Sequence, residues 1–302
     1  MKPLRIGTRK SELALWQAQS VQQQLENLGI QTTLVPISSA GDLNLTQPLY
    51  AMGIEGVFTK ALDTALLNNQ IDLAVHSLKD IPTQMAEGIC QAAVLPRENP
   101  LDILVLHPQF KDWASSPHIG TGSLRRKAQW LRKFPTHRVE NLRGNLQKRI
   151  EKLNKSDWGG ALFAAAGLNR LGWKLQHQTL NWMIPAPGQG AIAICCKSQE
   201  TTLKKQLEAL NCTQTALCTA LERQFLQILE GGCTAPIGAL ARIENNQIHF
   251  KAGLFSLDGQ QAIEYENKFT STAALEFAER AAEQIKSQGG DQLLKTIKEN
   301  LK

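Results

Sequence analysis

The chain has 302 residues, of which 42% are hydrophobic and 20% charged, an ordinary globular composition with room for two or three domains. No apolar run approaches the roughly 20 residues that a membrane helix needs, and the N-terminus lacks the apolar region of a signal peptide, so we expect a cytoplasmic protein without membrane partners. The net charge of +6 favours an acidic partner (nucleic acid, an anionic surface or a polyanionic small molecule), although solubility alone explains it equally well.

The first two-thirds of the chain alternates between strand and helix patterns and restarts near residue 101. This alternation is typical of βαβ units and predicts a mostly parallel sheet. Short apolar runs mark the strands, and amphipathic runs mark the helices. In chain order we predict a strand at 4–8, a helix at 11–29, a strand at 32–37, a helix at 56–70, strands at 71–77, 102–107 and 118–122, a helix at 123–134, a strand at 137–142, a helix at 145–154, and strands at 160–166 and 190–196.

The pattern changes at residue 213 to that of a separate α+β domain. Three strand-like runs are separated by the turn-forming pairs Asn245-Asn246 and Asp258-Gly259. Helical patterns precede and follow these runs. The predicted elements are a helix at 213–229, strands at 237–243, 247–255 and 261–269, and helices at about 272–287 and 290–300.

Two motifs in the α/β part resemble each other, RIGTRKS at 5–11 and HIGTGS at 118–123. Each places Ile-Gly-Thr at a strand end and a serine at the start of the next helix. Because ligands bind at the carboxyl ends of strands in open α/β sheets, two such lobes facing each other would form a cleft. The segment 38–57 contains four Gly or Pro residues and is too long for an ordinary connection, so it predicts a lid or a disordered loop.

Basic residues occupy the first turns of predicted helices, where the macrodipole opposes a cation by about 0.3–1 kcal/mol. Arg125 and Arg126 follow Thr121 and Ser123 at such a helix start. We therefore expect an anion to lie between the two guanidinium groups and the free N–H groups. A second site of the same kind comprises Arg9, Lys10 and Ser11.

Further arginines are dispersed along the chain. Arg143 precedes a Gly-Asn turn, and Arg170 lies in the stretch GLNRLG; both are suited to bidentate binding of carboxylates. For Arg149, an exposed helix position paired with Glu151 is a strong alternative. The dispersal argues against a linear nucleic-acid-binding stripe, and an aromatic content of 6% gives little support for base stacking.

Lys79 and Asp80 follow the buried strand at 71–77, and Pro82 fixes the exit of the chain. A surface Lys–Asp pair contributes little to stability. At the carboxyl end of a buried strand, however, the pair favours a catalytic carboxylate. We interpret His76 as a packing or hydrogen-bonding residue, because no Ser-His-Asp or Cys-His order accompanies it.

Six cysteines occur at 90, 195, 196, 212, 218 and 233, without C-x-x-C pairs or histidines at metal-ligand spacing. We therefore expect no metal site, and no disulfides in a reducing compartment. Cys233 lies in the stretch LEGGCTAPIG, after a helix C-terminus whose dipole raises a thiol pKa. That setting suits a sulfur modified once and kept as a thioether better than a nucleophile used in every turnover.

Seven stretches together resemble the hydroxymethylbilane synthase (porphobilinogen deaminase) family: IGTRKS, VHSLKDIP, IGTGSLRR, NLRGN, AAAGLNRLG, IPAPGQGA and LEGGCTAPIG. They occur in the family's order and cover nearly the whole chain. The resemblance implies an α/β fold with two lobes like type II periplasmic binding proteins, plus a C-terminal α+β domain with a three-stranded antiparallel sheet. It places domain 1 at 1–98 and 190–210, domain 2 at 99–189 and domain 3 at 211–302.

The resemblance also implies an activity. Members of the family condense four porphobilinogen molecules head to tail, release ammonia at each step, and liberate hydroxymethylbilane by hydrolysis. A dipyrromethane cofactor, bound through a thioether to the cysteine that matches Cys233, primes the chain. Asp80 matches the catalytic aspartate, and a monomer is expected. The matching substrate- and cofactor-binding residues are Arg9, Ser11, Lys79, Thr121, Ser123, Arg125, Arg126, Arg143, Arg149 and Arg170.

The sequence departs from the family pattern in three places. Gly122 stands where serine is usual, Glu55 replaces a common lysine, and Ala40 replaces a common arginine. All three lie in or near loops that would face the substrate. Two other functions stay open at this point: a non-catalytic two-lobed protein that binds small anions, and a nucleic-acid-binding protein.

Overall fold

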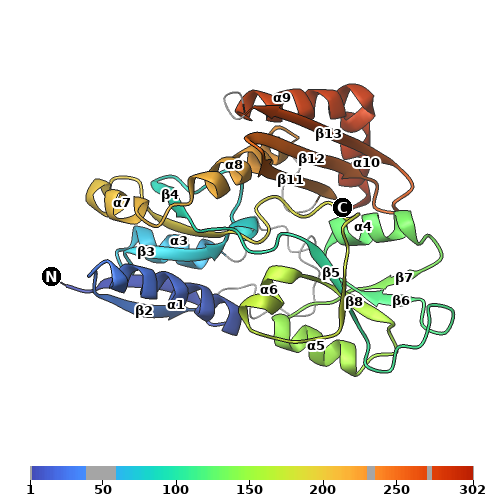
Figure 1. Cartoon of the computed structure of the whole chain (residues 1–302), viewed down its shortest axis with the longest axis horizontal. Helices are drawn as coiled ribbons and strands as arrows, with labels where there is room; N and C mark the ends of the chain where they lie inside the picture. The colour runs from blue at the N-terminus through green and yellow to red at the C-terminus, as the bar shows by residue number, and fades with distance from the viewer. Residues whose placement is uncertain (1, 39–58, 230–234, 271–273, 302) are drawn as a thin grey trace.

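A computed structural model describes residues 2–38, 59–229, 235–270 and 274–301 of the chain (Figure 1). Within these ranges the strands form three sheets, two with five strands and one with three. The two larger sheets belong to two α/β lobes, and the smaller sheet lies with its helices beside both of them (Figure 1). This arrangement confirms the expected fold class of two lobes and a C-terminal α+β domain.

The first lobe contains a mixed sheet with the strand order β2-β1-β3-β10-β4. Strand β1 runs parallel to β2 and β3, whereas β10 runs antiparallel to β3 and β4. The helices α1, α3 and α7 pack against this sheet. The bounds are β1 Leu4–Arg9, α1 Glu12–Asn27, β2 Thr32–Ile37, α3 Lys60–Leu67, β3 Leu73–Ser77, β4 Ile89–Val94, β10 Ile192–Lys197 and α7 Thr201–Glu208.

The second lobe repeats that topology position by position, in the order β7-β6-β8-β5-β9. Its first three strands are parallel, and β5 runs antiparallel to β8 and β9. The similarity of the motifs at 5–11 and 118–123 therefore extends to whole lobes. The bounds are β5 Asp102–Leu106, β6 His118–Gly120, α4 Leu124–Lys133, β7 Arg138–Glu140, α5 Leu146–Asn154, β8 Gly160–Ala164, α6 Ala165–Arg170 and β9 His177–Thr179.

The prediction of mostly parallel sheets is confirmed for four of the five strands in each sheet, and the remaining strand, β10 or β5, runs antiparallel to both of its neighbours. A parallel neighbour needs a crossover connection that returns the chain to the same end of the sheet. The fourth strand of each sheet, β10 or β5, instead follows a segment that crosses between the lobes, and it enters its sheet from the opposite end. The strand prediction at 160–166 also ends too late, since the chain turns into α6 at Ala165.

The C-terminal domain is an antiparallel sheet of β11, β12 and β13 covered by helices. Asn245 and Asn246 both have positive φ, as the predicted two-residue hairpin turn requires. Phe225 of α8 contacts Phe250 of β12 edge-on in the buried core. The bounds are α8 Thr213–Ile228, β11 Ile237–Glu244, β12 Gln247–Phe255, β13 Ala262–Thr270, α9 Ala274–Ile285 and α10 Asp291–Asn300.

A buried ion pair joins the C-terminal domain to both segments that cross between the lobes. Glu222 of α8 is fully buried and accepts two hydrogen bonds from the Arg97 guanidinium, at 2.6 and 3.0 Å. The same carboxylate accepts backbone N–H bonds from Gly188 at 2.7 Å and Ala241 at 2.8 Å. One side chain thus holds the outgoing segment, the returning segment and the edge of the third sheet.

We predict that Glu222→Leu lowers the free energy of unfolding by about 3–5 kcal/mol, because it leaves the Arg97 cation buried without its partner. Urea unfolding followed by circular dichroism measures the change. Glu264→Gln is the matched control, since Glu264 and Arg132 form a half-exposed pair at 4.0 Å. Equal midpoints for the two variants would contradict the structural role of Glu222.

Candidate functional site

A cavity of about 70 Å³ opens at the carboxyl ends of β1 and β3. These strands are parallel neighbours, so the residues that follow them meet at one edge of the sheet. Arg9 and Ser11 reach the cavity from the end of β1, and His76 and Asp80 reach it from β3 and the turn after it. The structure therefore brings together Arg9 and Ser11 of the second predicted anion site and the aspartate that the sequence singled out.

The predicted capping serines adopt equivalent positions in the two lobes. Ser11 precedes α1 and accepts a hydrogen bond from the Ala14 N–H at 3.4 Å, and Ser123 precedes α4 and accepts one from the Arg126 N–H, also at 3.4 Å. Thr121 is buried and accepts a bond from the Ser123 N–H. Both helices thus begin where the strand-end motifs predicted.

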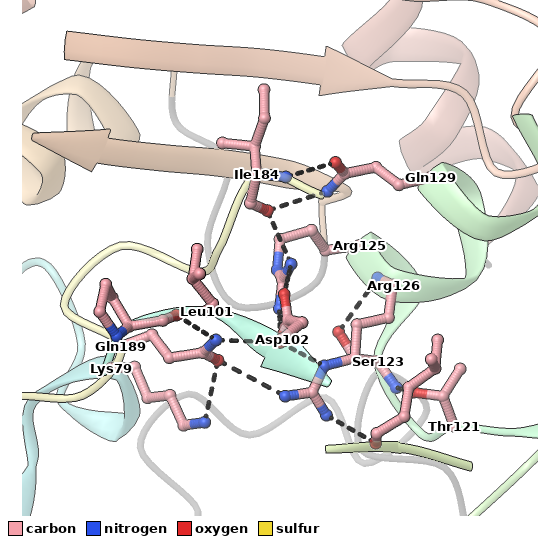
Figure 2. A network of polar contacts seen from close by, with 12 residues as sticks. Lys79, Leu101, Asp102, Thr121, Ser123, Arg125, Arg126, Gln129, Ile184 and Gln189 are labelled. Atoms are coloured by element: carbon pink, nitrogen blue, oxygen red, sulfur yellow. Dashed lines mark hydrogen bonds and ion pairs between the residues drawn. The ribbon is translucent and has the colours of Figure 1, made fainter. Parts of the chain in front are cut away.

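Gln189, in the returning segment between the lobes, connects Lys79 to the second lobe (Figure 2). Its side-chain oxygen accepts hydrogen bonds from Lys79 Nζ at 3.2 Å and from Arg126 at 3.5 Å. Its side-chain nitrogen donates to Asp102 at 2.9 Å and to the Pro100 carbonyl at 2.8 Å. This fully buried amide therefore fixes the distance between a cation of the first lobe and one of the second.

Asp102 supplies the negative charge that the two first-turn arginines of α4 were expected to need. Its fully buried carboxylate accepts bonds from Arg125 at 2.6 Å and from Arg126 at 2.9 Å. Although burial opposes the charged form, the two guanidinium groups hold the pKa of Asp102 well below its usual range. An additional role of these arginines in binding an external carboxylate stays a prediction.

Arg149 faces other charges across the site and does not occupy the exposed position considered for it. Its Nε donates to the Gly144 carbonyl at 2.7 Å. Burial and the charges of Arg126, Arg143 and Arg9 together lower its pKa to about 10, against the opposing effect of Asp80. These groups come from both lobes, so charged side chains of the two lobes lie close enough to Arg149 to shift its pKa.

Arg170 lies between the lobes near the returning segment. Its guanidinium donates to the Gly190 carbonyl at 2.6 Å and lies 5.9 Å from the centre of the Trp16 ring in α1. Burial lowers the pKa of Arg170 to about 10 and also lowers that of the buried Arg143. Four of the six predicted arginines, Arg125, Arg126, Arg143 and Arg170, are buried, whereas Arg149 is half-buried and Arg9 borders the cavity.

His76 is buried, as its interpretation as a packing residue requires. Within the described part of the chain its Nε2 has no hydrogen-bond partner. Burial, followed by the charge of Arg9, lowers the pKa of His76 to about 4, so the imidazole is neutral near pH 7. It lines the cavity beside Asp80 as an uncharged group.

Local packing explains why position 122 carries glycine where the family usually has serine. A Cβ atom at this position would lie 2.6 Å from the Leu142 carbonyl oxygen, closer than a side chain allows. A serine would require the backbone to move apart there. The other departures, Glu55 and Ala40, lie outside the described residues, as do Cys233 and nearly all of the predicted lid segment at 38–57.

Five of the six cysteines lie among the described residues. Cys90, Cys195, Cys196, Cys212 and Cys218 are free thiols. Over the described ranges, groups of three or more His, Cys, Asp or Glu side chains suitable for a metal are absent. Burial raises the pKa of Cys218 to about 11 and that of Cys196 to about 12, so these thiols stay protonated.

Sequence reasoning missed Asp102 and Gln189 as members of the site. Asp102 opens the otherwise apolar run DILVL, and a charged residue at the start of a buried strand is a usable signal. Gln189 lies inside the quoted motif IPAPGQGA but carried no separate signal, because its importance comes from partners distant in the sequence.

Comparisons with known proteins match the whole chain to one family. The model of the "Porphobilinogen deaminase, dipyromethane cofactor binding domain" matches residues 4–205, and that of the "Porphobilinogen deaminase, C-terminal domain" matches residues 216–287. The chain is 40% identical to the porphobilinogen deaminase of a Nostoc species, covering 98% of this chain and 95% of the relative. It is 41% identical to that of Desulfitobacterium hafniense, covering 99% and 98%.

A solved structure of similar fold is the periplasmic VFT2 domain of Bordetella pertussis BvgS. It has a TM-score of 0.41 and 11% sequence identity, and the match covers 68% of this chain and 85% of that domain.

We predict that Lys79 titrates near pH 8, because burial and the charge of Arg126 lower its pKa from 10.5 to about 8. The pKa is lower in the folded state, so the buried charge destabilises the fold at neutral pH, and this cost is relieved as the pH rises from about 8 towards about 10.5. NMR of lysine labelled with ¹³C at Cε should show one resonance that titrates well below the others and is missing in Lys79→Arg. Uniform titration of all lysines near pH 10.5 would contradict this environment.

Proposed function

The chain belongs to the porphobilinogen deaminase family, and from this premise we propose that it acts as hydroxymethylbilane synthase, a transferase of tetrapyrrole biosynthesis. It would condense four porphobilinogen molecules in sequence, release ammonia at each step and then release hydroxymethylbilane by hydrolysis. Every pyrrole carries an acetate and a propionate, so the growing chain is a polyanion. The proposed site must therefore bind many carboxylates and also perform acid–base chemistry.

The convergence of Asp80 with arginines of both lobes is the observation that carries the proposal. Arg9 and Asp80 line one cavity, and the charges of Arg9, Asp80, Arg126 and Arg143 all act on Arg149. Guanidinium groups held in a water-poor site attract carboxylates more strongly than exposed ones do. A binder of small anions would use the same cations, but it would not need a carboxylate among them.

We propose that Asp80 acts on the positive charge that develops during condensation. Departure of ammonia leaves an azafulvenium cation on the incoming pyrrole, and a fixed carboxylate beside it stabilises that charge. The terminal pyrrole carbon of the growing chain then forms the new carbon–carbon bond. Asp80 takes the proton that this carbon loses, and in the next cycle it can pass that proton to the amino group of the incoming porphobilinogen before ammonia leaves.

The donor set of the site fits a dipyrromethane cofactor, whose four carboxylates match a surplus of guanidinium groups and hydroxyls. When bound, the cofactor supplies the pyrrole carbon to which the first substrate is joined. We propose that Cys233 holds it through a thioether. The proposed substrate- and cofactor-binding residues are Arg9, Ser11, Lys79, Thr121, Ser123, Arg125, Arg126, Arg143, Arg149 and Arg170.

We also propose a cytoplasmic monomer that binds neither nucleic acid nor membrane. Across the described helices, none combines the length and the apolar character needed to span a bilayer. The division into domain 1 at 1–98 and 190–210, domain 2 at 99–189 and domain 3 at 211–302 stays a prediction. The membership of the strands in three sheets supports it.

We predict that protein purified from cells carries a covalent mass increment of two pyrrole units on the peptide that contains Cys233. Intact-mass and peptide mass spectrometry measure it directly. Cys233→Ser should lack the increment and form no hydroxymethylbilane, because it has no sulfur to hold the primer, whereas Cys212→Ser should retain both. An active wild-type preparation without the mass increment would contradict the proposed attachment of the cofactor to Cys233.

We predict that Asp80→Asn lowers kcat by roughly 10²–10⁴-fold, because the amide neither takes a proton nor offers a full negative charge. Product formation is measured at saturating porphobilinogen, and the cofactor content is determined separately by mass. Asp63→Asn is a matched control, since Asp63 is a part-buried carboxylate of the same lobe. Normal turnover by Asp80→Asn that carries its full content of cofactor would contradict the catalytic role of Asp80.

A further inference from the structure

Arg223 of α8 binds the turn that carries Lys79 and Asp80, although it belongs to the C-terminal domain. Its guanidinium donates to the Ile81 carbonyl at 2.8 Å and to the Pro82 carbonyl at 2.7 Å. A longer bond of 3.4 Å reaches the Leu78 carbonyl. A single charged side chain thus spans the backbone on both sides of the proposed catalytic pair.

The turn has few other constraints on this side. It is a single 3₁₀ turn, Leu78–Asp80, closed by the bond from the Ile81 N–H to the Leu78 carbonyl at 3.2 Å. On the opposite side the Leu78 N–H donates to the Ala191 carbonyl at 3.0 Å, which continues the pairing of β3 with β10. Pro82 has no N–H to donate, so hydrogen bonding at this position depends on its carbonyl. The turn is therefore held by β10 on one side and by the guanidinium of Arg223 on the other.

Neighbouring residues of α8 anchor two different parts of the molecule. Glu222 binds the segments that cross between the lobes, and Arg223 binds the turn after β3. Consecutive residues of an α-helix point about 100° apart, so one helix can reach both parts without distortion. The position of α8 therefore directly affects the position of the backbone that carries Asp80.

We propose that Arg223 is a positioning residue for the condensation reaction. It holds the segment Leu78–Pro82 so that the Asp80 carboxylate keeps one place relative to the reacting carbon while the C-terminal domain stays docked. This inference rests on the proposed function of Asp80. Because catalytic geometry is sensitive to displacements of about 1 Å, with losses of about 10²-fold, loss of this support should affect turnover without removing any group that touches substrate.

The proposal depends on the planar guanidinium of arginine, because the consecutive carbonyls of Ile81 and Pro82 each accept a hydrogen bond from a different nitrogen of Arg223. Lysine keeps the charge but offers a single nitrogen. Arg223→Lys should therefore be only partly active, and Arg223→Ala should be slow. Free guanidinium ion, which can occupy the vacated space, should restore part of the rate of Arg223→Ala at concentrations that leave the wild-type enzyme unaffected.

The test measures kcat, KM for porphobilinogen and cofactor mass for wild type, Arg223→Lys and Arg223→Ala, with Arg280→Ala, an exposed arginine on α9, as the control. We expect kcat to fall by about tenfold to a hundredfold in Arg223→Ala while KM and cofactor loading stay unchanged, with partial rescue by guanidinium. Unchanged kcat, or a rise in KM alone, would overturn the proposal.

Hydrogen exchange keeps the proposal testable if Arg223→Ala folds poorly. Peptides spanning 73–85 should exchange faster in Arg223→Lys than in wild type, whereas peptides of β11 should not change. Equal protection of the turn in both proteins would overturn the positioning role. Failure of the proposed function is distinguishable, because wild-type protein would then form no hydroxymethylbilane, while the exchange difference would still report on the contact.

Discussion

The buried carboxylate of Asp102 between two guanidinium groups is the interaction on which the second lobe's part of the site depends. Removing these charges from water costs several kcal/mol for each ion, and that cost is offset only when the remaining hydrogen-bonding positions are filled. Here Arg125 also donates to the Ile184 carbonyl, Arg126 to the Leu162 carbonyl, and Gln189 to Asp102 itself. The ion cluster thereby fixes the start of α4 against the segment that returns to the first lobe.

Neighbouring cations of the site differ in how far the protein itself satisfies their hydrogen-bonding groups. The guanidinium groups of α4 are largely satisfied by the protein, whereas Arg9 borders the open cavity beside Asp80. Gln189 separates the two environments, because its amide binds Lys79 on one side and the Asp102 cluster on the other. The site is therefore built from a buried charged centre, drawn in Figure 2, and a more accessible rim that includes Arg9 at the cavity.

The sequence predicted elements with strong periodicity and clear ends, including α1, α8 and the hairpin through Asn245-Asn246. It missed β4, β9, α6 and α7. The strand β9 consists of the exposed residues His-Gln-Thr and exists because β5 pairs with it, so it has no apolar pattern to detect. Helix α7 has no side-chain cap at its start. The antiparallel direction of β10 and β5 was not predicted, because pairing across distant segments is a tertiary property.

The site residues were predicted unevenly for a similar reason. Motifs at strand ends located Arg9, Ser11 and Asp80, since the topology of parallel strands brings such ends together. The partners of Arg125 and Arg126 lie in the same lobe but far away in the sequence, and the contacts of Gln189 and Arg223 join residues from separate lobes and domains. Local sequence patterns carry no information on those pairings.

The position of β10 between β3 and β4 has a consequence for biosynthesis of the chain. The ribosome releases β3 and β4 early, but the strand that must lie between them follows only after the whole second lobe has been made. The first sheet therefore remains divided until residue 197 has left the exit tunnel, while the second lobe can close earlier. Nascent chains would thus complete the later lobe first, and their unfilled β3 edge is a surface that chaperones must shield.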